Sequence, residues 1–189
     1  MTGLGAAGES LLDAGELAGI VDRLGAEITR DHPEGVVLVG ILKGSALLVA
    51  DLARTLTISC EIDFLALSAY GSGGTRVRIA KDLDIDVAGK DVVLVTDLVD
   101  TGLTLGYVRR LLAERGARSI EACALLDRTR RRLLPVEVRY VGRQIGDEYL
   151  VGYGLDLDER YRNLPGIVAV EPEVLRTAPD AMVERLARR

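Results

Sequence analysis

The segment 92–104, with the sequence VVLVTDLVDTGLT, constrains the fold more than any other part of the chain. It begins with an uninterrupted run of Val and Leu, which is typical of a strand buried on both faces of a parallel sheet. Asp97 and Asp100 follow this run, where we expect the strand to reach its carboxyl end. Open α/β sheets bind their ligands at that edge. The segment therefore predicts an α/β fold with a ligand site directly after a central strand.

The turn that follows the two acids predicts phosphate binding. Thr101, Gly102 and Thr104 open a helical pattern, so they offer unpaired backbone N–H groups and two hydroxyls at a helix N-terminus. The helix dipole adds partial positive charge there, which favours an anion. Carboxylates suited to sugar hydroxyls or a metal ion thus stand beside an anion site. This combination indicates a phosphorylated sugar as the ligand.

The rest of the chain alternates between strand and helix patterns. Asp13 and Glu16 have the spacing of a capping box, and the helix predicted after them ends before His32. The alternation predicts a mostly parallel twisted sheet flanked by helices, in a single domain of residues 1–189 with a flexible tail over 1–10. We expect strands over 36–41, 59–67, 77–80, 92–95, 120–126, 136–141 and 168–170, and further helices over 45–55 and 103–115.

Composition excludes several classes of protein. The net charge of −5 argues against a general nucleic-acid or anionic-membrane binder. With one His, two Cys and no CxxC or HExxH pattern, nothing in the sequence predicts a zinc site held by the protein. There is no secretory signal pattern and no apolar run approaching 18 residues, so we expect a cytoplasmic protein.

The sequence resembles the hypoxanthine-guanine phosphoribosyltransferases of the type I phosphoribosyltransferase family. Segment 92–104 resembles the family's signature for phosphoribosyl diphosphate (PRPP), within a longer similar stretch over 77–105. The resemblance implies Mg²⁺-dependent transfer from PRPP to hypoxanthine or guanine, which gives IMP or GMP and pyrophosphate, on the type I fold with a small hood. Four more segments resemble the family in its order: GILKGSALLVADLAR (40–54), DFLALSAYGSG (63–73), ALLDR (124–128) and DEYLVGYGLDLDERYRNLP (147–165).

The resemblance also implies roles for the residues of the signature. Asp97 would hold the ribose hydroxyls, with Thr96 beside it, and Asp100 would lie near N7 of the purine as the general base or acid. A carboxylate suits this proton transfer if its surroundings place its pKa appropriately. The 5′-phosphate would be held by Thr101, Gly102, Leu103 (through its backbone) and Thr104.

Other segments supply the remaining parts of the implied site. Lys43, Gly44 and Arg162 would contact pyrophosphate, and Tyr70 with Gly71 would belong to a lid that excludes water. Magnesium would be bound by Asp156 and Asp97, because Mg²⁺ prefers oxygen ligands and bridges phosphates. The base would be bound by Arg128, by Tyr149 through stacking and by the Leu150 backbone.

Four residues depart from the family pattern. Thr96 stands where the family usually has Glu, and Ala69 where it usually has Ser. Arg128 replaces the usual Lys that recognises the purine 6-oxo group, and Tyr149 replaces the commoner Phe. These departures leave two alternatives open. One is a PRPP-binding regulatory protein, and the other is a divergent enzyme with weak activity or altered base specificity, for example toward xanthine.

The basic run 128–132 is the one feature that suggests nucleic-acid binding. We interpret it as a solvated turn, because no aromatic residues are interleaved for base stacking. The expected partners are therefore PRPP and a purine base, with neither nucleic acid nor membrane. The resemblance adds a homodimer or homotetramer.

Overall fold

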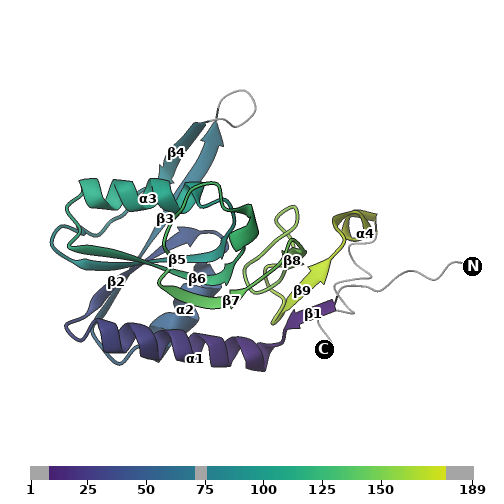
Figure 1. Cartoon of the computed structure of the whole chain (residues 1–189), viewed down its shortest axis with the longest axis horizontal. Helices are drawn as coiled ribbons and strands as arrows, with labels where there is room; N and C mark the ends of the chain where they lie inside the picture. The colour runs from purple at the N-terminus through teal and green to yellow at the C-terminus, as the bar shows by residue number, and fades with distance from the viewer. Residues whose placement is uncertain (1–8, 71–75, 178–189) are drawn as a thin grey trace, which may run out of the picture.

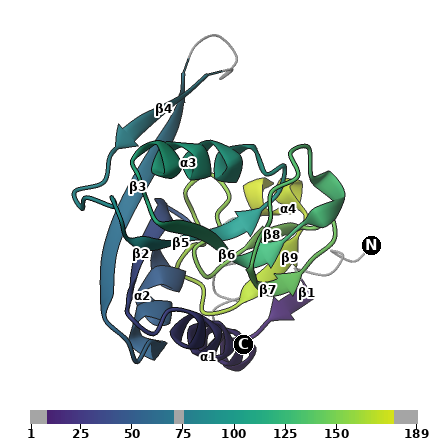
Figure 2. The ribbon, with the colours of Figure 1, turned by 60° about the vertical axis from the view of Figure 1, so that its left-hand side comes forward.

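The structure, a computed structural model, describes residues 9–70 and 76–177. Its main sheet has six strands in the order β4-β3-β2-β5-β6-β7 (Figure 1). Neighbouring strands are parallel except β3 and β4, which form an antiparallel ribbon at one edge that extends beyond α3 (Figure 2). The strands are β2 (Val36–Leu42), β3 (Cys60–Tyr70), β4 (Arg76–Lys81), β5 (Asp91–Val99), β6 (Ser119–Asp127) and β7 (Tyr140–Gln144).

Strand β5 lies at the centre of the sheet and is buried on both faces, as its apolar run predicts. Successive side chains of a strand point to opposite faces. Val93 and Val95 accordingly belong to the core cluster on one face, while Val92 and Leu94 belong to the cluster on the other. All four are fully buried. The sheet therefore separates two hydrophobic cores, and each is closed by helices.

Helices α1 (Ala14–Asp31) and α2 (Ala46–Thr55) cover one face of the sheet, and α3 (Leu103–Glu114) covers the other (Figure 1). The predicted capping box is present at the start of α1. Asp13 Oδ1 accepts a hydrogen bond from Glu16 N (2.8 Å), and Glu16 Oε2 accepts one from Asp13 N (2.9 Å). Among the described residues, no helix is both long enough and apolar enough to cross a membrane.

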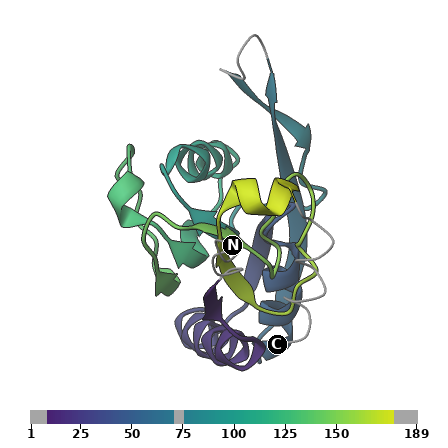
Figure 3. The same cartoon turned by 90° about the vertical axis from the view of Figure 1, so that its right-hand side faces the viewer.

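A second, antiparallel sheet forms the hood from both ends of the described chain. Strand β1 (Glu9–Leu12) pairs with β9 (Ile167–Val170), which also pairs with β8 (Tyr149–Val151) (Figure 3). The short helix α4 (Pro172–Thr177) follows β9. Because β1 begins at Glu9, the expectation of a flexible tail through residue 10 does not hold for residues 9 and 10. Residues 1–8 lie outside the described residues.

Two strand boundaries differ from the sequence prediction by four residues, more than any other boundary of the predicted strands. Strand β5 continues to Val99 because its ladder with β6 persists to that residue, so Asp97 lies within the strand. Strand β7 begins only at Tyr140, although we expected it to begin at 136. Val136 and Val138 pack against the core on the α3 face while the chain there pairs with no neighbouring strand. Their apolar pattern therefore reflects burial rather than strand pairing.

Candidate active site

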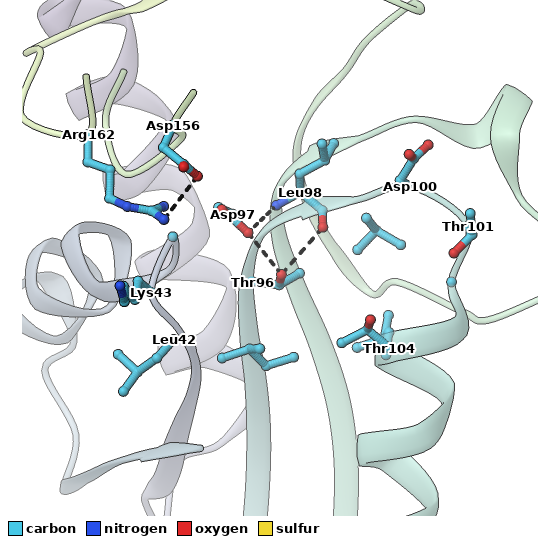
Figure 4. Close-up of a pocket in the computed structure, with 15 residues that line it drawn as sticks. Leu42, Lys43, Thr96, Asp97, Leu98, Asp100, Thr101, Thr104, Asp156 and Arg162 are labelled. Carbon is cyan, nitrogen blue, oxygen red and sulfur yellow. Dashed lines mark hydrogen bonds and ion pairs between the residues drawn. The ribbon is translucent and has the colours of Figure 1, made fainter. Parts of the chain in front are cut away.

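A cavity of about 340 Å³ opens at the carboxyl ends of β2 and β5. It is lined by residues 41–44 at the end of β2, by residues 96–102, 104 and 105 from the end of β5 to the start of α3, and by Asp156 and Arg162 from the hood (Figure 4). These are the positions at which a parallel sheet directs its loops toward a ligand. The cavity thus brings together most of the residues that the sequence singles out, from three separate segments.

Asp97 lies deep in the cavity with a fixed carboxylate. Its Oδ1 accepts hydrogen bonds from Leu98 N (2.8 Å) and Thr96 Oγ1 (3.2 Å), and Thr96 also approaches Leu98 O at 3.4 Å (Figure 4). Burial raises the pKa of Asp97, while these hydrogen bonds and the Arg162 charge oppose that rise. The carboxylate is therefore an enclosed acceptor whose charge a ligand hydroxyl or a cation can stabilise.

The backbone of the turn after β2 packs directly against the Asp97 carboxylate. A Cβ at Gly44 would stand 1.6 Å from Asp97 Oδ2, so only glycine fits this position. The Leu42–Lys43 peptide bond, which precedes it, is cis. On its other side, Gly154 has a φ of +97°, and a Cβ there would meet Gly44 O at 2.0 Å. We did not predict a role for Gly154 from the sequence, although the Gly-Tyr-Gly pattern around it could have suggested a tight approach.

The turn before α3 presents the predicted phosphate site. Gly102 has a φ of +81°, and Thr101, Gly102 and Thr104 line the cavity. The Thr101 carbonyl accepts hydrogen bonds from Leu133 N (2.9 Å) and Leu134 N (3.1 Å), which hold the turn from outside. Leu103 does not line the cavity and its side chain is 55% exposed. Only the Leu103 backbone is therefore positioned to contact a ligand.

Asp100 faces the cavity from the other side of this turn. Its Oδ2 lies 3.7 Å from Arg128 Nη1 and 3.9 Å from Arg131 Nη1. Its Oδ1 is buried and has no hydrogen-bond partner within the described part of the chain. Buried polar atoms are normally paired, so an orphaned carboxylate oxygen at a cavity suggests a ligand donor as its partner. We did not predict the contribution of Arg131 from the sequence.

The three residues expected to bind the base lie beside the cavity and not in its lining. Arg128 is buried, and it donates from Nε to Gly146 O (2.7 Å) and from Nη2 to Glu148 O (2.6 Å). Tyr149 is half exposed, and its hydroxyl donates to Asp156 O (3.1 Å). Leu150 is buried in β8. Arg128 thus braces the loop that leads to Tyr149, a structural role that the sequence does not reveal.

Two carboxylates are in a position to hold a metal ion. Asp97 and Asp156 both line the cavity, and Asp156 Oδ1 forms an ion pair with Arg162 Nη2 at 2.9 Å. Nowhere in residues 9–70 and 76–177 do three or more His, Cys, Asp or Glu residues gather as they would to bind a metal ion. Oxygen donors in small number suit Mg²⁺, which keeps several waters and shares its coordination with substrate phosphates. The donor set therefore fits magnesium.

The remaining predicted residues lie at the edges of the site. Lys43 and Gly44 line the cavity beside Arg162. Tyr70 is the last residue of β3, whereas Gly71, the other predicted lid residue, lies outside the described residues. The structure thus brings together the predicted phosphate, ribose, pyrophosphate and metal residues.

Comparison with known proteins gives consistent results. Residues 7–159 match the family model of the phosphoribosyl transferase domain. The chain is 45% identical over 165 residues to a hypoxanthine phosphoribosyltransferase of Escherichia coli K12, covering 84% of this chain and 93% of that protein. It is 43% identical over 171 residues to a hypoxanthine-guanine phosphoribosyltransferase of Staphylococcus aureus Mu50, covering 88% and 95%. A crystal structure of a hypoxanthine phosphoribosyltransferase from Staphylococcus aureus superposes with a TM-score of 0.84 at 43% identity, covering 88% of this chain and 92% of that one.

Proposed function

The chain belongs to the hypoxanthine-guanine phosphoribosyltransferase family, and from this premise we propose that it performs purine salvage. It transfers the phosphoribosyl group of PRPP to hypoxanthine or guanine, giving IMP or GMP and pyrophosphate. The observation that carries this proposal is a single cavity. There the backbone of an anion-binding helix N-terminus meets two carboxylates near the end of β5 and two cations.

The phosphate and the ribose are positioned by the end of β5 and the start of α3. Thr101, Gly102 and Thr104, with the Leu103 backbone, bind the 5′-phosphate through N–H groups and hydroxyls. Asp97 accepts hydrogen bonds from the ribose hydroxyls, and Thr96 keeps its carboxylate oriented. Holding the sugar at both ends fixes the anomeric carbon for attack, which removes most of the entropic cost of the reaction.

Asp100 is the group that transfers the N7 proton of the purine. Its Oδ1, which has no hydrogen-bond partner among the described residues, accepts the N7 proton or returns it, and the Arg128 and Arg131 guanidiniums stabilise the carboxylate near Oδ2. Arg128, Tyr149 and the Leu150 backbone recognise the base, with Tyr149 stacked on its face. Arginine donates hydrogen bonds to a 6-oxo group, so adenine, which presents a 6-amino donor there, is discriminated against.

Pyrophosphate leaves toward the cations on the hood side of the cavity. Lys43, the Gly44 N–H and Arg162 bind its oxygens, and Tyr70 with Gly71 belongs to the lid that keeps water from the reacting sugar. Asp156 and Asp97 would hold Mg²⁺, which when bound would neutralise charge on the leaving pyrophosphate. We further propose a cytoplasmic enzyme that acts as a homodimer or homotetramer.

The decisive experiment is an assay of pyrophosphate release from PRPP with a panel of purines and pyrimidines in the presence of magnesium. We expect hypoxanthine and guanine to be the best substrates. Preferential use of xanthine would support the alternative that Arg128 favours, an enzyme of altered base specificity. PRPP binding without turnover of any base would support the alternative that Thr96 favours, a regulatory protein.

A further inference from the structure

Glu159, to which we have so far assigned no role, makes ion pairs with both side-chain cations of the pyrophosphate site. The same carboxylate oxygen, Oε2, accepts hydrogen bonds from Lys43 Nζ (2.9 Å) and Arg162 Nη2 (3.3 Å). Lys43 and Arg162 line the cavity, whereas Glu159 lies just outside its lining. Glu159 Oε2 therefore contacts both Lys43 and Arg162, the two cations that would bind pyrophosphate oxygens in the proposed reaction.

The loop between β8 and β9 (residues 152–166), which we call the hood loop, holds Glu159 in this position through its backbone. Glu159 has a φ of +65°, which non-glycine residues rarely adopt, and its N–H donates to Asp156 Oδ2 (2.9 Å). The other oxygen of Asp156 pairs with Arg162 (2.9 Å). These four residues thus form a connected network of two cations and two anions with no net charge. Hydrogen bonds from Lys43 and then from Arg162 lower the pKa of Glu159.

We propose that Glu159 is an internal competitor of pyrophosphate, whose carboxylate occupies the cations when the site is free and must be displaced by the substrate. This inference rests on the proposed function of the cavity. Pyrophosphate oxygens then take the place of Oε2 on Lys43 and Arg162. When pyrophosphate departs, Glu159 takes the cations back, which favours release of the product.

The contact is weak enough to be displaced in every catalytic cycle. The side chains of Lys43 and Glu159 are 67% and 63% exposed, and exposed ion pairs are strongly screened by solvent. Displacement therefore lowers the affinity for pyrophosphate without preventing its binding. Asp158 offers a matched control residue, because it is an acid in the same loop and also has a positive φ, of +52°. It pairs with Arg176 (3.4 Å) and not with the cavity.

The test compares Glu159→Gln with Asp158→Asn in the full-length protein. Both variants remove one negative charge from the same loop, but only the first removes the anion that Lys43 and Arg162 share. Calorimetry with inorganic pyrophosphate, with and without magnesium, measures the affinity directly. We expect Glu159→Gln to bind pyrophosphate about three- to tenfold more tightly than the unmodified protein, since two ion-pair contacts no longer have to be broken. Asp158→Asn should change the affinity by less than about twofold, as expected for a distant surface charge.

IMP serves as a second ligand because its phosphate is directed to the turn before α3 and not to Lys43. The unmodified protein and the two variants should therefore bind IMP with equal affinity. The KM for pyrophosphate in the reverse reaction should fall in Glu159→Gln, while the KM for IMP stays unchanged. Unchanged or weaker pyrophosphate binding by Glu159→Gln, with normal IMP binding, would overturn the inference and leave the proposed function intact. Failure of the unmodified protein to bind either ligand would instead overturn the proposed function.

Discussion

Asp97 and Asp100 are two carboxylates near the end of β5 whose surroundings suit them to different tasks. Asp97 is enclosed and already accepts hydrogen bonds from Leu98 and Thr96. Asp100 has two guanidiniums near its Oδ2, and its Oδ1 has no hydrogen-bond partner among the described residues. Different environments for neighbouring carboxylates commonly mark different roles. Here they fit a fixed ribose ligand and a group that exchanges a proton.

Replacement of Asp100 by Asn tests the second role. We expect turnover with hypoxanthine to fall by roughly 10²–10⁴, the usual range for loss of a general acid or base. Affinity for IMP, measured by calorimetry, should change little because the phosphate turn is intact. The matched control is Asp147→Asn, which removes an exposed carboxylate that also pairs with Arg131 (3.0 Å). Normal turnover by Asp100→Asn would show that another group transfers the proton.

Thr96→Glu tests the largest departure from the family pattern. A carboxylate accepts from a ribose hydroxyl more strongly than a hydroxyl does, at about 1.5–3 kcal/mol for charge-assisted bonds against about 0.5–1.5 for neutral ones. It also adds repulsion with Asp97, whose pKa burial already raises. In the presence of magnesium we expect PRPP to bind about three- to tenfold more tightly once this repulsion is discounted.

Thr96→Gln is the control for this substitution, because it has the size of Glu without the charge. Calorimetry of PRPP with magnesium compares the three proteins. If both variants bind PRPP more weakly than the unmodified protein, the pocket is shaped around Thr96 and has no room for a longer side chain. Weaker binding by the Glu variant alone would mean that repulsion with Asp97 outweighs the stronger hydrogen bond.

Most residues of the site, though not Arg131, Gly154 or Glu159, could be predicted from the sequence, but many of their contacts could not. The pattern of acids and small residues after an apolar run indicates a phosphate site from local chemistry alone. The pairing of Lys43 with Glu159 joins residues 116 positions apart, and it depends on how the hood packs against the sheet. The contacts of Arg128 with Gly146 and Glu148 depend on a loop conformation in the same way.

At the scale of elements, the site depends on two backbone segments that meet without side chains between them. The turn after β2 and the hood loop touch through Gly44 and Gly154, and Asp97 fills the space on the other side of Gly44. There is no room for a methyl group at this contact, because its nearest neighbours would be a backbone carbonyl and an enclosed carboxylate. The glycines therefore set the distance between the hood and the sheet.

Gly44→Ala should misplace Asp97 and the pyrophosphate site together. The added Cβ would lie 1.6 Å from Asp97 Oδ2, so the carboxylate or the turn must move. A displacement of about 1 Å in a catalytic group costs on the order of 10²-fold in rate, and we expect kcat/KM for PRPP to fall by about that factor. The control is Gly19→Ala, on the exposed side of α1, where a Cβ meets nothing within 4 Å. Gly19→Ala should keep full activity and be slightly more stable, whereas full activity in Gly44→Ala would contradict the packing described.

Elements were predictable where local patterns and tertiary packing agree. The capping box at Asp13 and the apolar face after it predict α1, and the run 92–95 predicts the buried part of β5. Strand β1 was not predicted, because four residues have too little periodicity and the strand exists only through pairing with β9. The extension of β5 through Asp97 to Val99 likewise depends on its ladder with β6.

At the scale of the whole molecule, alternation of strand and helix predicts the α/β sheet and its two cores. The hood could not be derived from periodicity, since its strands come from opposite ends of the chain, and it was expected only from the family resemblance.

At the amino ends of the strands, opposite the cavity, polar contacts link the elements. There a network of charged and polar side chains links the end of α1 to β5, β6 and β7.

This network makes stability depend on pH through Asp31, the last residue of α1. Its carboxylate accepts hydrogen bonds from Arg139 Nη2 (2.8 Å) and Tyr140 Oη (3.2 Å), which join α1 to β7. Hydrogen bonding to Arg139 is the main reason that the pKa of Asp31 is lowered from 3.8 to about 2. Hydrogen bonding to Arg118 lowers the pKa of Asp91, at the start of β5, to about 2 in the same way. Both groups are ionised above pH 4 in the folded and the unfolded chain, so their contribution is complete there. Between about pH 4 and 2 the unfolded chain binds protons first, and the contribution is lost.

Asp31→Asn should therefore lower the free energy of unfolding at pH 7, and the difference from the unmodified protein should shrink as the pH falls from 4 toward 2. Urea unfolding followed by circular dichroism at pH 7, 5, 4 and 3 measures this difference. Asp22→Asn, on the exposed face of the same helix, removes an equal charge and controls for the overall change in net charge. Its effect on stability should be small at every pH. A difference between Asp31→Asn and the unmodified protein that is as large at pH 3 as at pH 7 would mean that Asp31 acts through packing. In that case its ionised contacts with Arg139 would not be what joins α1 to β7.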